Sequence, residues 1–233
     1  MSQDDFAIVV GISRYPSLGE PPNEALDLRG PENDTDAVVE WLKNSSGGSM
    51  PDANIKTIKS AQLASSAATA GAGPTRDQIE DHFLWLHHLA LKNKESGRGM
   101  TVGRRLYVYM SGHGFSPRPS RGCLFTANAT MDFGANVYPS AWLDWFRDSG
   151  YFSEFVLWLD CCMNRVGTIP PSEVQLAPKT SPEAAGRHLS LSPLNGPLRL
   201  SSSPSLKTRV RSTVSSRGRS LRVCGEPPLM SSE

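Results

Sequence analysis

Short apolar runs alternate with amphipathic stretches over the amino-terminal part of the chain. The apolar runs are β-branched and nearly continuous, which is typical of strands covered on both faces. We expect strands at 6–12, 55–59, 105–110 and 155–159. Stretches whose apolar residues recur three and four positions apart predict helices at 33–43, 75–96 and 140–147. Strands that alternate with helices indicate an α/β fold, with a mostly parallel sheet and helices on both faces.

The helix at 75–96 has the clearest boundaries. Thr75 and Gln78 have the spacing of a capping box, in which each side chain bonds the backbone N–H of the other residue. Gly97 and Gly99 follow the last apolar positions, and glycine commonly ends a helix because it tolerates a positive φ. Both ends of this helix are therefore predicted from the sequence.

The composition changes near residue 167. No Phe, Trp or Tyr follows Trp158, serine is abundant, and seven Lys or Arg residues stand against two acids after His188. Such a segment buries too little apolar surface to offset the entropy lost on ordering. We expect a folded domain over 1–167 and a disordered Ser/Arg/Pro-rich tail over 168–233.

Charge and cysteine content limit the partners and the compartment. The formal net charge is +1, which gives no global field for nucleic acid or membrane. No apolar run approaches the ~20 residues that span a bilayer, and the polar start does not resemble a secretory signal. The four cysteines, of which Cys161 and Cys162 are adjacent, form no disulfide framework and no Cys-Xaa-Xaa-Cys metal motif. We expect a cytoplasmic protein with no metal centre, no cofactor, and no nucleic-acid or membrane partner.

Two of the expected strands end in residues that can carry chemistry. Gly112-His113-Gly114 follows one strand, and Asp160-Cys161-Cys162 follows another. The carboxyl ends of parallel strands share one edge of a sheet, so neighbouring strands would bring the imidazole and a thiol together. An imidazole activates a thiol as a nucleophile and later protonates the leaving amine. The N–H groups of Gly114 and Cys162 are candidates for an oxyanion site.

Four motifs in this order resemble the caspase, metacaspase and paracaspase superfamily. They are Ala7-Ile-Val-Val-Gly-Ile-Ser-Arg-Tyr15, Gly30-Pro-Glu-Asn-Asp34, Tyr109-Met-Ser-Gly-His-Gly114 and Leu159-Asp-Cys-Cys162. The resemblance implies a cysteine endopeptidase that acts on proteins or peptides, with His113 and Cys162 as its catalytic dyad. Cys162 is 49 positions after His113, and the caspase interval is ~50. Cys161 then fills the variable position between the acid and the nucleophile.

The resemblance also implies a pocket for a basic side chain. Asp34, Ser111 and Asp160 match the pocket positions of metacaspase-like members, which implies cleavage after Arg or Lys. Two acids in a pocket favour a cation and disfavour an aspartate. Asp34 has a second interpretation, because Asn33, Asp34 or Thr35 can cap the helix at 33–43. Calcium dependence stays open.

The chain departs from the family pattern after the nucleophile. Many relatives continue Cys-His-Ser-Gly, whereas this sequence has Cys162-Met-Asn-Arg165. The resemblance also implies a second portion with two more strands, and 168–233 does not have the pattern to form them. We therefore expect a sheet that is incomplete after its fourth main strand. The chain is then either a natural half-enzyme or carries a tail read in a shifted frame or spliced differently, and the composition favours the second.

A second function is compatible with the same residues. A caspase-like half-domain without its second portion can serve as a catalytically inactive interaction module. Its open sheet edge would pair with a copy of itself or with a caspase-like relative. A separate interpretation is that Cys162 is a packed core cysteine, a common environment for this residue type.

Overall fold

The computed structural model describes residues 3–18, 26–60, 72–118, 121–130 and 134–162. The predicted disordered tail at 168–233 lies outside these residues. The elements expected from the sequence fall almost entirely within them, so their type and bounds can be compared directly.

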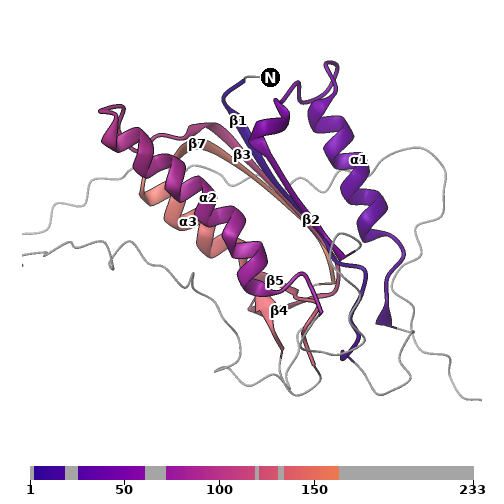
Figure 1. The fold of residues 1–233 in the computed structure, drawn as a ribbon. Helices are drawn as coiled ribbons and strands as arrows, with labels where there is room; N and C mark the ends of the chain where they lie inside the picture. The colour runs from indigo at the N-terminus through magenta and orange to yellow at the C-terminus, as the bar shows by residue number, and fades with distance from the viewer. Residues whose placement is uncertain (1–2, 19–25, 61–71, 119–120, 131–133, 163–233) are drawn as a thin grey trace, which may run out of the picture. The chain divides into compact units, whose positions relative to one another are not determined.

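Four strands form a parallel sheet (Figure 1). They are β1 (Asp5–Gly11), β2 (Ile55–Lys59), β3 (Gly103–Ser111) and β7 (Phe152–Asp160). Their order is β2-β1-β3-β7, and each neighbouring pair is parallel. The predicted α/β fold with a mostly parallel sheet is confirmed. Within the described residues β1 and β3 are central, and β2 and β7 are the edge strands.

Helices cover both faces of the sheet, with α1 (Pro31–Lys43) on one side and α2 (Arg76–Glu95) and α3 (Pro139–Asp148) on the other (Figure 1). Alternate residues of β1 therefore enter different cores. Ala7 and Val9 belong to the cluster that includes Leu42 of α1. Ile8 and Val10 belong to the larger cluster that includes Phe83 of α2 and Trp142 of α3. Burial on both faces explains why the β1 sequence is apolar at nearly every position.

The capping box predicted for α2 is confirmed. The Gln78 N–H donates to Thr75 Oγ1 over 3.4 Å, and the Thr75 N–H donates to Gln78 Oε1 over 2.8 Å. The last turn ends before Gly97, whose φ of 73° lies in the left-handed region that favours glycine. Local sequence chemistry thus determines both ends of this helix.

The cap predicted for α1 is wrong. The helix begins at Pro31 rather than at residue 33, its N-cap is Gly30, and no side chain caps it. Proline suits the first helical position because a backbone N–H there would have no partner within the helix, and proline has none. Asp34 therefore lies within the first turn, and its side chain is available for another role.

A second, smaller sheet follows β3. It consists of β4 (Gly114–Arg118), β5 (Arg121–Phe125) and β6 (Asn136–Val137), paired antiparallel in that order. The sequence indicated only an apolar patch at 123–125. Phe115 and Phe125 stack with their ring centroids 4.7 Å apart, which packs β4 on β5. This sheet supports the segment that follows His113. A short 3-10 helix, η2 (Asp52–Asn54), precedes β2.

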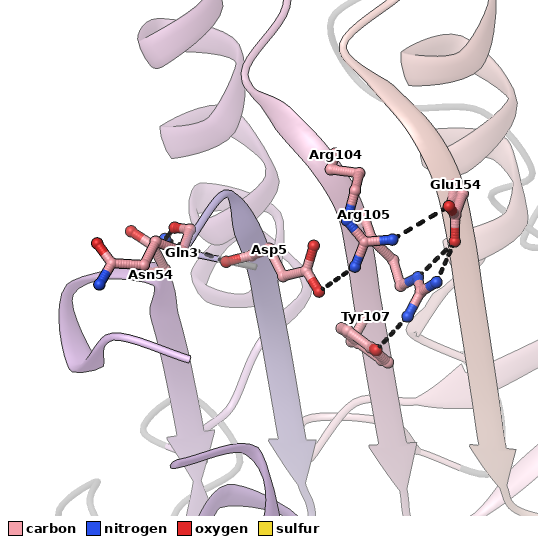
Figure 2. Close-up of polar contacts among 7 residues, drawn as sticks. All are labelled: Gln3, Asp5, Asn54, Arg104, Arg105, Tyr107 and Glu154. Carbon is pink, nitrogen blue, oxygen red and sulfur yellow. Dashed lines mark hydrogen bonds and ion pairs between the residues drawn. The ribbon is translucent and has the colours of Figure 1, made fainter. Parts of the chain in front are cut away.

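Charged side chains join the three strands β1, β3 and β7 at their amino ends (Figure 2). The Arg104 guanidinium lies 2.7 Å from Asp5 Oδ2 and 3.1 Å from Glu154 Oε1. Arg105 also binds Glu154 and donates to the Tyr107 hydroxyl over 2.8 Å. Because Asp5 is fully buried, Arg104 neutralises a carboxylate that has little access to water.

Candidate active site

His113 and Cys162, the predicted dyad, follow the carboxyl ends of β3 and β7. These strands are neighbours, and their last register pair is Ser111 with Asp160. Beyond that pair the Gly112 N–H donates to the Asp160 carbonyl over 3.3 Å. His113 lies two residues after Ser111, and Cys162 lies two residues after Asp160. The fold therefore brings both segments to one edge of the sheet.

His113 is held at its backbone and at its ring. Its backbone N–H donates to the Tyr15 hydroxyl over 2.8 Å, and its ring packs on Tyr15 with centroids 4.8 Å apart. The ring nitrogen Nε2 lies 2.6 Å from the Leu26 carbonyl oxygen. A carbonyl can only accept, so we assign the proton to Nε2, and Nδ1 of the neutral imidazole is then the proton acceptor.

The Leu26 and Tyr15 contacts were not predicted. Leu26 contributes a backbone carbonyl, which any residue type could supply, so the sequence holds no signal for it. Tyr15 lies within the first family-like motif, but the motif says nothing of the partner of its hydroxyl. The Tyr15 N–H donates to Asp27 Oδ1 over 2.9 Å, so Tyr15 is bonded to the residue that follows Leu26.

Cys161 is packed against the backbone that follows His113. A Cβ placed on Gly114 would lie 2.5 Å from Cys161 Sγ and 2.6 Å from the Cys123 carbonyl oxygen, so only glycine fits there. Burial, together with the smaller effects of Cys162 and Asp160, raises the pKa of the Cys161 thiol to about 12. Cys161 therefore stays protonated at neutral pH, which leaves the half-buried, reduced Cys162 as the candidate nucleophile.

The segment proposed for oxyanion binding is well supported by neighbouring backbone. Gly114 opens β4 opposite Leu124, and the Phe125 N–H donates to the His113 carbonyl over 2.8 Å. These contacts fix the backbone around Gly114 beside the end of β7. The role of the Gly114 and Cys162 N–H groups at an oxyanion stays a prediction.

The three predicted pocket residues lie in one cluster, which also contains Tyr109. The hydroxyls of Tyr109 and Ser111 donate to Asp160 Oδ2 over 3.4 Å and 3.5 Å. Partial desolvation raises the pKa of Asp34, and the charge of Asp160 raises it further, so Asp34 of α1 lies within electrostatic range of Asp160. Burial likewise raises the pKa of Tyr109 to about 12, and both acids contribute. We call Asp34, Tyr109, Ser111 and Asp160 the acid cluster.

Tyr109 was missed because its position suggested only a core residue. A signal was present, since Tyr109 and Ser111 are two apart in a strand and must share one face of the sheet. Tyr109 packs in the core cluster on the α1 side, the helix that supplies Asp34. The two carboxylates are exposed, so the cluster combines a buried hydroxyl with negative charge that solvent or a ligand can reach.

Two other observations concern classes of site. Among the described residues, no group of three or more His, Cys, Asp or Glu side chains is arranged to hold a metal ion. The helices in the described ranges are too short or too polar to cross a membrane. Comparison with protein-family models and with curated protein sequences finds no match for the chain.

Proposed function

We propose that the chain is a caspase-like cysteine endopeptidase that cleaves after Arg or Lys, with Cys162 and His113 as its dyad. One observation carries the proposal: the acid cluster lies at the edge of the sheet where β3 and β7 deliver these two residues. A thiol, an imidazole and paired carboxylates are the groups that such a reaction requires.

The mechanism follows from the roles of these groups. His113 Nδ1 accepts the Cys162 proton, and the thiolate attacks the scissile carbonyl carbon. The imidazolium then protonates the leaving amine as the C–N bond breaks and a thioester remains. His113 next takes a proton from water, whose oxygen attacks the thioester and releases the acid and the thiol. The Leu26 carbonyl, 2.6 Å from Nε2, supports the imidazolium during both steps.

The acid cluster sets the substrate preference. A bound Arg or Lys side chain would lie beside both carboxylates. The charge of Asp160 contributes to the raised pKa of Asp34 when the site is empty, so a cation relieves this repulsion. An aspartate at the same position would add a third negative charge. The preference for a basic residue is therefore both attraction of one substrate and rejection of the other.

The proposal is tested with fluorogenic peptides that end in Arg, Lys or Asp, assayed with and without calcium. We expect turnover after Arg or Lys, abolished in Cys162→Ala and retained in Cys161→Ala, which is the matched control one residue away. Turnover that survives in Cys162→Ala, or cleavage after Asp alone, would contradict the proposal.

A second candidate function is a catalytically inactive interaction module. In the part of the chain that the structure describes, β7 is paired on one side only, and its residues from Phe155 to Leu159 are half-exposed. Unpaired strand edges favour association. A folded protein that hydrolyses none of the peptides and sediments as a dimer would favour this function.

A further inference from the structure

We propose that Tyr15 is a positioning residue for His113, acting through its hydroxyl; the inference rests on the proposed function. The hydroxyl accepts the His113 N–H over 2.8 Å and lies 3.4 Å from the Phe125 carbonyl oxygen, to which it donates. It thereby links the end of β3 to β5. Tyr15 is fully buried, so water does not replace it at either contact.

The surrounding backbone is shaped to admit this hydroxyl. A Cβ placed on Gly112 would lie 2.4 Å from the Tyr15 oxygen, so glycine at this position leaves the space that the hydroxyl occupies. Burial raises the pKa of Tyr15 above its ordinary value, so the hydroxyl keeps the proton that it donates to Phe125. Gly112 therefore leaves the room that the Tyr15 hydroxyl needs to bind the His113 N–H.

Tyr15 is itself held in place from its own segment. Its N–H donates to Asp27 Oδ1 over 2.9 Å, and the adjacent Leu26 supplies the carbonyl that faces His113 Nε2. The backbone N–H of His113 and its ring are thus oriented by neighbouring parts of one segment. The Tyr15 hydroxyl fixes the position of the His113 backbone, and the Leu26 carbonyl fixes the orientation of its ring.

Loss of the hydroxyl predicts a selective defect. In Tyr15→Phe the ring contact remains, but the His113 N–H loses its acceptor and the imidazole is free to change position. Displacements near 1 Å are enough to lower turnover about 100-fold. We expect kcat to fall about 10- to 100-fold. KM for an Arg peptide should not change, because Asp34 and Asp160 come from α1 and β7.

The matched control is Tyr151→Phe. Tyr151 is also buried, and its hydroxyl bonds a histidine nitrogen, His87 Nδ1, over 2.6 Å, but it belongs to neither the dyad nor the acid cluster. Both variants are compared for kcat, KM and the pH midpoint of Cys162 alkylation. Alkylation is read by mass spectrometry of the peptide that contains Cys162, in a Cys161→Ala background so that the adjacent thiol does not contribute. We expect Tyr15→Phe to move the midpoint upward toward ~8.5, the value of a free cysteine, and Tyr151→Phe to leave it unchanged.

Two further variants separate the possible failures. A wild-type midpoint below ~8.5 that rises in His113→Ala, but not in Tyr15→Phe, overturns the role of Tyr15 and leaves the dyad standing. A midpoint that is the same in wild type and His113→Ala overturns the dyad and the Tyr15 inference with it. If Tyr15→Phe does not fold, Asp27→Ala takes its place. Asp27 is exposed, and its replacement removes the acceptor of the Tyr15 N–H. An unchanged kcat and midpoint in Asp27→Ala would then overturn the inference.

Discussion

At the scale of single residues, the acid cluster places two like charges where folding alone would not favour them. Asp34 is exposed, but the fold removes part of its hydration and the charge of Asp160 acts on it, and both effects raise its pKa. An acid whose pKa is raised by the fold contributes stability at low pH and loses it as the pH rises. At neutral pH the pair therefore opposes folding, as is common where function requires strain.

Asp34→Asn should separate binding from stability. Removal of one charge should raise KM for an Arg peptide about 10-fold with little change in kcat, while the urea midpoint at pH 7 stays the same or rises. The control is Asp36→Asn on the same helix, whose carboxylate lies 2.6 Å from Lys59 Nζ and outside the cluster. An Asp34→Asn variant with a lower urea midpoint and unchanged KM would show that Asp34 is structural.

The candidate site residues that the sequence indicated occur in motifs, and the residues it did not indicate are those defined by tertiary contact. Asp34, Ser111 and Asp160 were found because they match a pattern, and the structure brings them together. Leu26 and Tyr15 act on His113 through a carbonyl and a hydroxyl whose partners are distant in the chain. Only the tertiary structure determines such partners.

At the scale of elements, ends were predicted well where a local side chain defines them. The Thr75 capping box determines the start of α2, but α1 begins at Pro31 without a side-chain cap. The strand at 155–159 resembled a buried strand, yet β7 is an edge strand of half-exposed residues in the described part of the chain. Apolar composition indicates a strand, but the number of its neighbours depends on topology.

The charged network at the amino ends of the strands gives a test of how β3 is held to β1. Arg104→Ala leaves the buried Asp5 carboxylate without its cation, and we expect the unfolding free energy to fall by about 2 kcal/mol. Arg147→Ala removes an ion pair whose two side chains are both exposed, and should change stability by less than about 0.5 kcal/mol. If urea unfolding gives the same loss of unfolding free energy in both variants, burial of Asp5 does not strengthen its ion pair with Arg104.

At the scale of the whole molecule, two histidines of α2 make stability depend on pH. Burial lowers the pKa of His82, whose Nε2 has no hydrogen-bond partner, and the nearby Lys56 lowers it further. Burial also lowers the pKa of His87, and His88 adds to the shift. A histidine with a lowered pKa contributes stability above ~6.5 that is lost as the pH falls through that value.

We therefore expect the unfolding free energy to fall between pH 7.5 and pH 5.5. Replacement of His82 and His87 by Gln should flatten this dependence. The exposed His88 supplies only the smaller cause of the His87 shift, so His88→Gln should flatten it much less. Glu80 has a raised pKa and acts in the opposite direction, but it is present in all three proteins. Urea unfolding across this range gives the slopes, and equal slopes would contradict the assignment.

The order of strands along the chain determines when the site comes into existence. The pair Ser111 and Asp160 joins positions 160 − 111 = 49 residues apart, and contacts of large sequence separation form late in folding. β1, β2 and β3 leave the ribosome with His113, but Asp160 and Cys162 arrive only with β7. Under the proposed mechanism, the nascent chain is therefore inactive until β7 docks, because it has His113 and Asp34 but lacks Cys162 and Asp160.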